Sequence, residues 1–409
     1  MIFRRESVQG DRRWFPRPND IIAYNLLDAM RHPSCPLCAL TQRREDGFLF
    51  SLFWENVNSP HIRQRLRESL GFCDLHTRTL RLAANQPWVG PFGIAILYRD
   101  FVDTVRGRLR RPDPLYARLF TKNSSRVRNH LSPSRRCWLC EVSEETEDTY
   151  LDALVEGLDT SPVLRDKYSE SHGLCILHAE RAARSTGMAE TRSALVRAAF
   201  RQSRALSDPS SDIADLERFL LGYRSAAEFM LLANTLDSVC PPCEAEAIAK
   251  ESALQGMPSD DLTADWRRLC SRHRSQATLS TLRRFGAAEG FVQNLVQCAV
   301  LDADESEKGY ECPVCYRARQ AAREAVLRAG EDMGRTACLF HFRMALSTGN
   351  PAQTQACVDS LATRLDSLSR DLGELIRKNE YRFSHEPLGE EMGSWLRALV
   401  FFGSERAAP

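Results

Sequence analysis

Four copies of one cysteine and histidine pattern run along this chain of 409 residues and constrain its fold more than any other feature. Each copy is a Cys-x-x-Cys followed at a distance by a Cys-x-x-His, and together the copies take up twelve of the fourteen cysteines. In chain order the pairs are Cys35 and Cys38 with Cys73 and His76, Cys137 and Cys140 with Cys175 and His178, Cys240 and Cys243 with Cys270 and His273, and Cys312 and Cys315 with Cys338 and His341.

The first two copies arose by internal duplication. They align without a gap over 42 residues, and the two pairs within each are separated by 34 residues, whereas the gap shortens to 26 and 22 in the later copies. A match of that length indicates repeats of about a hundred residues. The boundaries we expect are an N-terminal extension at 1–19, repeats at 20–122, 123–224, 225–305 and 306–379, and a C-terminal tail at 380–409.

Each repeat is expected to be a helical hairpin. Ser59-Pro60 and Ser161-Pro162 are typical of helix starts, and we expect the helix that follows to run into the Cys-x-x-His, where positions i and i+3 share a face. The stretch after each Cys-x-x-Cys has helical length and composition. The pattern predicts that each copy closes its own set of four side chains near the open end of its hairpin.

A third helix follows the Cys-x-x-His. Apolar residues recur at helical spacing from Ile94 to Leu109, and those between Val358 and Leu375 alternate three and four apart. We interpret these stripes as the core of a bundle, with a dimer interface as the alternative. No strand pattern is evident, so the fold class is all-α, a tandem repeat of metal-stapled hairpins with a third packing helix per unit.

Three thiolates and one imidazole are the ligand set of a closed, tetrahedral structural zinc site. A cytosolic location disfavours disulfides, so we expect four Zn²⁺ ions, one per copy, held by the twelve cysteines and four histidines of the pattern. Iron-sulfur clusters are the alternative, although they usually take four cysteines. Haem attachment is disfavoured because no histidine directly follows a Cys-x-x-Cys. His32, His172, Cys298 and Cys357 are interpreted as surface or core residues.

The net charge of +1 gives no overall attraction to nucleic acid. Residues 104–136, however, include ten Lys or Arg and one acidic residue, whereas residues 137–164 include eight acidic residues and no basic one. A nucleic-acid surface is the functional interpretation of this basic stretch. A solvated connector, or attraction between the two segments, is the simpler one.

The C-terminal tail is chemically crowded. Arg382, Glu386, Glu390 and Trp395 lie within a short segment and form a candidate partner or functional site, and an enzyme using the tail carboxylates is a further alternative. In the simpler interpretation the acidic residues stabilise a helix N-terminus, Arg382 pairs with a carboxylate, and Trp395 packs against the fold.

The N-terminal twenty residues lack the apolar segment of a signal peptide, and the apolar runs are too short to span a membrane. We therefore expect a cytoplasmic protein with no membrane partner.

The segment WENVNSPHIRQRLRESLGFCDLH, the repeated CPxC and GxCxxH, and the ending EYRFSHEPLGEEMGSWLRALVFF resemble an uncharacterised prokaryotic family of unknown function. The similarity extends from Asp20 to about Gly403, and it implies no particular activity. The second copy departs from the family pattern because its Cys-x-x-Cys lacks the proline of CPxC. The last two copies depart from it because they lack the glycine of GxCxxH. The overall expectation is a metal-stabilised scaffold, without evident catalysis, that binds a protein partner.

Overall fold

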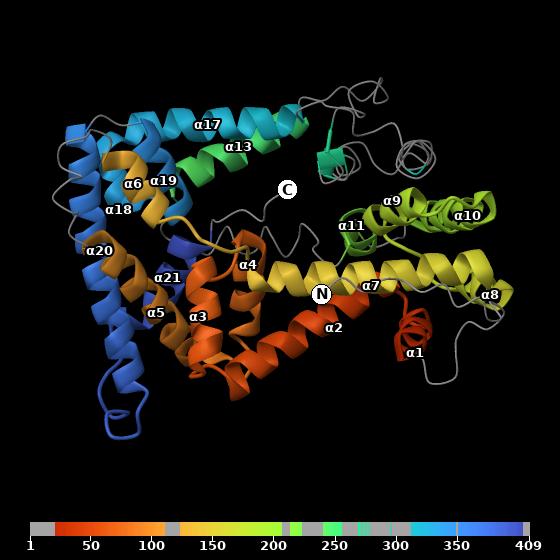
Figure 1. Cartoon of the computed structure of the whole chain (residues 1–409), viewed down its shortest axis with the longest axis horizontal. Helices are drawn as coiled ribbons and strands as arrows, with labels where there is room; N and C mark the ends of the chain where they lie inside the picture. The colour runs from red at the N-terminus through yellow and green to blue at the C-terminus, as the bar shows by residue number, and fades with distance from the viewer. Residues whose placement is uncertain are drawn as a thin grey trace, which may run out of the picture. The chain divides into compact units, whose positions relative to one another are not determined.

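The computed structural model describes residues 21–110, 123–206, 213–222, 240–255, 269–270, 273–274, 276–277, 296, 312–348 and 351–403. Among these residues all regular structure is helical and no strand occurs, which confirms the all-α prediction (Figure 1).

The chain forms two compact units, each assembled from three separated segments. The first comprises residues 1–43, 145–228 and 257–311, and the second comprises residues 44–144, 229–256 and 312–409. Each unit therefore draws on several repeats.

In its described residues, the first unit holds the beginning of α2 (Pro36–Phe50), the later part of α7 (Trp138–Thr160), and five further helices. These are α1 (Ile21–Ala29), α8 (Pro162–Glu170), α9 (Ile176–Ser185), α10 (Ala189–Leu206) and α11 (Ile213–Leu221). Helices α8, α9, α10 and α11 pack on one another, and Tyr168, Leu195 and Phe219 are among the side chains buried there.

The second unit holds the rest of α2, the beginning of α7, and most of the remaining helices. These are the π-helical turn η1 (Ser51–Glu55), α3 (Pro60–Ser69), α4 (Asp74–Ala83), α5 (Gly90–Arg110), α6 (Asn123–His130), α13 (Pro241–Gln255), α17 (Pro313–Ala329), η5 (Gly330–Asp332), α18 (Met333–Thr336), α19 (Leu339–Thr348), α20 (Pro351–Lys378), η6 (Glu390–Gly393) and α21 (Ser394–Phe402).

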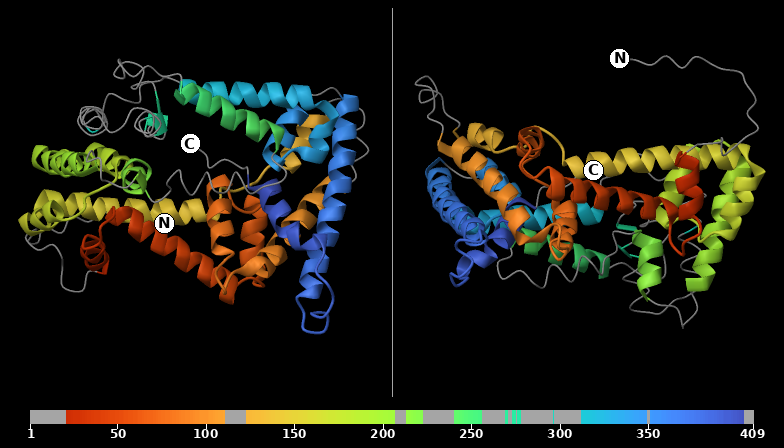
Figure 2. Two further views of the ribbon diagram at one scale, coloured as in Figure 1. Left: turned by 180° about the vertical axis from the view of Figure 1, so that it is seen from behind. Right: turned by 90° about the horizontal axis from the view of Figure 1, so that it is seen from below.

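The apolar stripes on α5 and α20 form the core of the second unit. Helix α20 lies along α5, and α21 packs against both (Figures 1 and 2). Leu361, Leu365 and Leu372 of α20 are fully buried, as are Tyr98 and Phe101 of α5. The bundle-core interpretation of both stripes is thereby confirmed. Beside them, α13 and α17 run together as a pair (Figure 2).

The Cys-x-x-His pairs begin new helices, which corrects the expectation that the preceding helix runs into them. After α3 the backbone turns through Leu70, at φ 52°, and Gly71, at φ 93°, and Cys73 then caps α4. In the second copy Gly173, at φ 84°, makes the same break before Cys175 caps α9. Glycine tolerates this left-handed conformation without steric cost, which explains the glycine two residues before Cys73 and two residues before Cys175.

The Cys-x-x-Cys pairs also open helices. Pro36, Pro241 and Pro313 are the first residues of α2, α13 and α17. Proline suits this position because its fixed φ matches the helix and its missing N–H would have no partner there. The proline thus starts a helix at each of these three pairs.

Candidate metal centres

All sixteen side chains of the pattern come together in four groups, each of three cysteines and one histidine, with donor atoms within 4.8 Å of one another. We name them site A (Cys35, Cys38, Cys175, His178), site B (Cys73, His76, Cys137, Cys140), site C (Cys240, Cys243, Cys338, His341) and site D (Cys270, His273, Cys312, Cys315).

The predicted pairing within each copy is wrong, because the copies exchange partners. In site A the Cys-x-x-Cys of the first copy meets the Cys-x-x-His of the second, and in site B the remaining pairs of these two copies meet. The third and fourth copies are exchanged in the same way in sites C and D. Two copies are therefore needed to complete a site.

Helix lengths explain the exchange. In the second copy α7 has 23 residues, about 34 Å at 1.5 Å per residue, whereas the returning helix α8 has 9 residues, about 14 Å. In the fourth copy α17 has 17 residues, and the return consists of the short η5 and α18. The returning segment is too short to bring the Cys-x-x-His back to its own Cys-x-x-Cys.

Two contacts measure this shortfall. His76 reaches Glu45 of its own copy, and Glu45 lies seven residues after Cys38. In the second copy His178 reaches Glu147, seven residues after Cys140. Seven residues are about two helical turns, or about 10 Å. Each histidine therefore lies about that far, along the helix that its own Cys-x-x-Cys begins, from those cysteines.

The donor atoms of sites A, B and C are closely spaced. In site B the sulfurs of Cys73 and Cys140 lie 3.3 Å from the Nδ1 atom of His76 and 3.5 Å from each other. Across the three sites the sulfur-to-nitrogen distances are 3.2 to 3.5 Å, and one pair of sulfurs in each site lies 3.5 to 3.8 Å apart. The histidine presents Nδ1 to the sulfurs in each of them.

Two helix N-termini converge on each of these sites. Helices α2 and α9 begin at site A, α7 and α4 at site B, and α13 and α19 at site C. A helix N-terminus carries partial positive charge and unpaired N–H groups, which stabilise nearby anions. In site C the backbone N–H of His341 points at the Cys338 sulfur, 3.4 Å away. The helix starts thus favour thiolates at these positions.

The thiols of one site cannot all ionise together without a cation. In site A, burial alone would raise the pKa of Cys35, but hydrogen bonds with Cys175 and Cys38 hold that pKa well below its usual range. The same hydrogen bonds with Cys175 and Cys35 raise the pKa of Cys38 well above its usual range. A divalent cation would offset this repulsion, because it lets every ligand bind in its deprotonated form. The donor set therefore fits a bound metal ion.

In sites A, B and C the other ring nitrogen of the histidine faces a carboxylate, and sequence reasoning missed these acids. Nε2 lies 3.2 Å from Glu45 at His76, 3.8 Å from Glu147 at His178, and 3.7 Å from Glu246 at His341. A detectable signal was present, since Glu45 and Glu147 occupy equivalent places in the aligned first and second copies.

Exposure differs among the sites. The four ligands of site A are all buried, whereas site D includes the exposed Cys270. His32 is exposed and belongs to none of the four sites, nor does the half-buried His172. Cys357 is buried in the core of the second unit, as expected, and Cys298 lies outside the described residues.

The tail residues are engaged in ion pairs and packing. Arg377 donates to both carboxylate oxygens of Glu386 and thereby lowers the pKa of that carboxyl group. Trp395 packs against the core at the start of α21, and Glu390 begins η6 just before it. Arg382 lies over the ring of Tyr381, at 5.7 Å, where a carboxylate partner was expected. A lowered pKa suits a salt bridge and is opposite to what a general acid requires.

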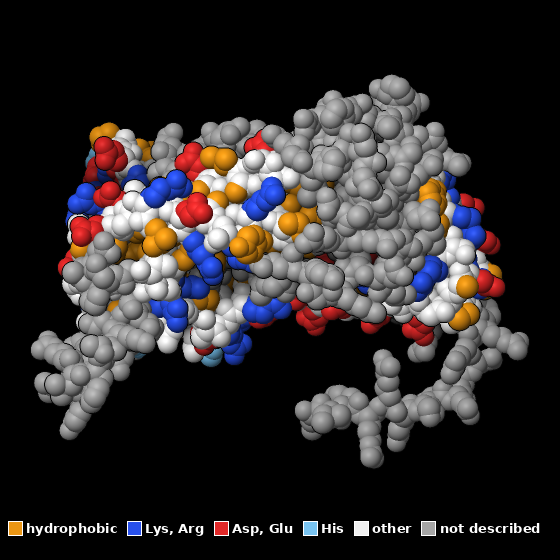
Figure 3. Space-filling view, turned by 90° about the horizontal axis from the view of Figure 1, so that it is seen from above, with side chains coloured by type: hydrophobic (Ala, Val, Ile, Leu, Met, Phe, Trp, Pro, Cys, Tyr) orange, Lys and Arg blue, Asp and Glu red, His pale blue; other side chains and the backbone are white. Residues whose placement is uncertain are grey.

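The described part of the basic stretch is largely neutralised by neighbouring acids. Arg135 pairs with Glu68 and Arg136 pairs with Glu144, while residues 111–122 lie outside the described residues. On the face drawn in Figure 3, basic, acidic and apolar side chains are interspersed. These pairs weigh against a continuous nucleic-acid surface.

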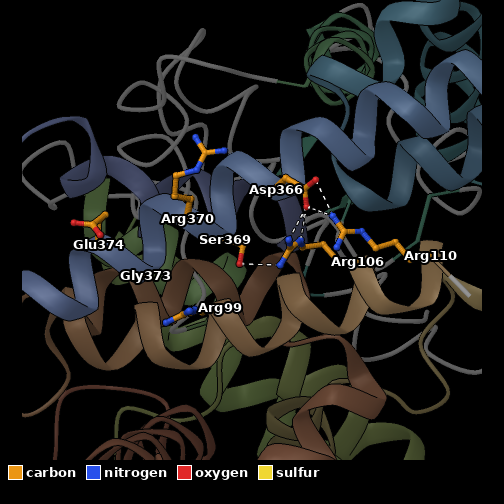
Figure 4. A pocket seen from close by; sticks show the side chains of 8 residues that line it. All are labelled: Arg99, Arg106, Arg110, Asp366, Ser369, Arg370, Gly373 and Glu374. Carbon is orange, nitrogen blue, oxygen red and sulfur yellow. Dashed lines mark hydrogen bonds and ion pairs between the residues drawn. The ribbon is translucent and has the colours of Figure 1, made fainter.

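A cavity of about 540 Å³ lies between α5 and α20 and is lined by four arginines (Figure 4). Arg106 donates to Asp366 at 2.7 Å and to Ser369 at 3.1 Å, and Arg110 donates to the same carboxylate. Arg106 lowers the pKa of Asp366. The arginines thereby tie the two core helices together.

Within the described ranges, no helix combines the length and the apolar character needed to cross a membrane. Fold and sites together define an all-helical protein with four Cys₃His groups that can hold metal ions.

Comparisons with known proteins place similar sequences in a family of unknown function. Residues 19–202 match the model of a family of unknown function, DUF6062, and both site A and site B lie within that match. The chain is also similar to an uncharacterized 23.9 kDa protein in the xynA 3' region of Caldicellulosiruptor sp. (strain Rt8B.4), with 25% identity over 153 residues, 37% of this chain and 67% of the relative. No solved structure matches the chain. These findings support the resemblance to an uncharacterised family of unknown function.

Proposed function

We propose that this protein is a zinc-stabilised helical scaffold, with one Zn²⁺ ion in each of sites A to D and no catalytic role for the metal. The carrying observation is that four protein donors already complete each set, which leaves no position for substrate or water. Bound zinc would stabilise the fold by fixing two helix starts to one another. The described cysteines form no disulfide, and thiol ligands suit the reducing conditions of the cytoplasm, where we place the protein.

The spacing of the donor atoms supports a single ion over an iron-sulfur cluster. Tetrahedral zinc, with bonds of about 2.3 Å to sulfur and about 2.0 Å to nitrogen, separates its ligands by about 3.5 to 3.8 Å. In site A the sulfurs of Cys38 and Cys175 lie 3.6 Å apart, and in site C those of Cys243 and Cys338 lie 3.8 Å apart. A cluster would hold its cysteines farther apart, because several irons and inorganic sulfides lie between them.

Elemental analysis and an absorption spectrum of the anaerobically purified full chain test this proposal. A colourless protein with close to four zinc ions per chain is the expected result. A brown protein containing iron and acid-labile sulfide would overturn it in favour of an electron carrier or redox sensor. Removal of zinc by a chelator should also reduce the helical signal in circular dichroism, since metal binding is coupled to folding.

We further propose that the scaffold binds another protein through aromatic side chains at the end of α2. Phe50 and Trp54 are 43% and 68% exposed, and their rings stack with centroids 6.1 Å apart. Large exposed aromatics are typical of protein interfaces, and π-helical turns such as η1 are frequent at functional positions. Cross-linking in cells followed by mass spectrometry should recover a protein with the native chain and lose it with Trp54→Ser. Leu82→Ser, at a side chain that is 44% exposed, is the control that should keep the partner.

A further inference from the structure

The carboxylates behind the histidines differ from site to site. We propose that Glu45 is a positioning residue that makes site B the tightest of sites A, B and C. This inference rests on the proposed metal binding and concerns how strongly each site holds its ion.

A histidine that binds metal through Nδ1 must carry its proton on Nε2. A carboxylate that accepts from this N–H fixes the tautomer, orients the ring, and makes the ligating nitrogen more basic. In site B, Oε1 of Glu45 lies 3.2 Å from Nε2 of His76, within hydrogen-bonding distance, and the two side chains are 2% and 0% exposed. Burial protects this interaction from competition by water.

Glu45 is itself held in place. Ser143 donates its hydroxyl to Oε1 of Glu45 at 2.5 Å. Ser143 belongs to α7, whose start carries Cys137 and Cys140 of the same site. One carboxylate therefore links the histidine helix of site B to its cysteine helix, which restricts both ligand pairs to the binding geometry.

The equivalent acid of site A is directed elsewhere. Arg181 donates to Glu147 at 2.7 Å, whereas Nε2 of His178 lies 3.8 Å from that carboxylate, beyond hydrogen-bonding distance. The Arg181 guanidinium neutralises the Glu147 carboxylate, which would otherwise act on the His178 imidazole. In site C, Glu246 lies 3.7 Å from His341 and 3.9 Å from Lys250. Both sites thus lack the short contact between histidine and carboxylate that site B has.

Competition with a chromogenic chelator, on the full-length zinc protein, tests the proposal. We expect Glu45→Gln, which keeps an acceptor and loses the charge, to weaken one zinc site, and Glu45→Ala to weaken it further, by about 10 to 100-fold. Glu147→Gln should shift its own site less. Glu156→Gln, at an exposed position of α7, is the control that should leave every site unchanged.

Two further measurements separate positioning from a general loss of stability. Nitrogen NMR of the His76 ring should show a hydrogen bond from Nε2–H to Glu45 in the native zinc protein, and Glu45→Ala should lose this hydrogen bond while the proton stays on Nε2. If Glu45→Ala does not fold, Ser143→Ala provides the test, because loss of the anchor should weaken the same zinc to an intermediate degree.

The order of release identifies the tight site. In a Cys73→Ser, Cys140→Ser chain the most slowly released of the zinc ions in sites A, B and C should be missing. If the most slowly released zinc ion is still present in that chain, or if both Glu45 variants release zinc as the native chain does, the inference is overturned. Either result would leave the proposed scaffold function standing. A chain purified without zinc would instead refute the proposed function itself.

Discussion

The sulfur of Cys38 lies 3.6 Å from the sulfur of Cys175, although 137 residues separate them in the chain. Cys73, the expected partner of Cys38, belongs to a different site. The exchange makes the first two copies mutually dependent, since each supplies half of the ligands for both sites.

Pairs of cysteine substitutions distinguish this arrangement from closure within each copy. Cys38→Ser with Cys175→Ser removes two ligands of one site and should lower bound zinc by about one equivalent, measured by elemental analysis. Cys38→Ser with Cys73→Ser damages two sites and should lower it by about two. The reverse pattern would restore the pairing within copies.

Gly222 lies so close to site A that there is no room for a side chain at this position. Its φ is +69°, and a Cβ atom built there would lie 3.0 Å from the Cys38 sulfur and 3.5 Å from that of Cys175. We expect Gly222→Ala to release the site A zinc at lower chelator concentration, because the methyl group displaces a ligand and the backbone is strained. Gly47→Ala on α2, where a Cβ meets nothing within 4 Å, should retain all zinc. Equal behaviour of the two variants would contradict this account.

The α20 seam should dominate the stability of the second unit. Leu365 is fully buried, so Leu365→Ala should lower the free energy of unfolding by about 2 to 5 kcal/mol through lost burial and a residual cavity. Leu327→Ala on α17, where the side chain is 63% exposed, should change it by about 0.5 kcal/mol or less. Chemical denaturation at constant zinc concentration measures both. A comparable loss of unfolding free energy in the two variants would show that the α20 seam does not dominate the stability of this unit.

The tail gives a pH prediction. Lys378 donates to Glu391 at 2.8 Å and, with the N–H of Gly389, lowers the pKa of that carboxyl group to about 2. A carboxyl group with a lowered folded-state pKa stabilises the fold above its unfolded pKa of about 4.3, and this contribution is lost as pH falls through about 4 towards 2.

Carbon NMR of the Glu391 carboxylate checks this prediction. At pH 4.3 it should still be ionised in the native chain, and Lys378→Met should raise the pKa of the carboxyl group and leave a larger fraction protonated at that pH. A carboxylate that titrates identically in both chains would show that Lys378 does not set its pKa.

The sequence by itself determined the chemistry and the helices of this protein. The cysteine and histidine spacing identified the sixteen donors, and the apolar period identified the α5 and α20 stripes, because both signals are local along the chain. The partners of each donor were decided only by the tertiary structure. All four copies offer the same donor atoms, so closure within a copy and exchange between copies give chemically equivalent ligand sets. Helix length decides between them: α8 is shorter than α7, the returning histidine stops about two turns short, and it meets Glu147 there instead of its own cysteines.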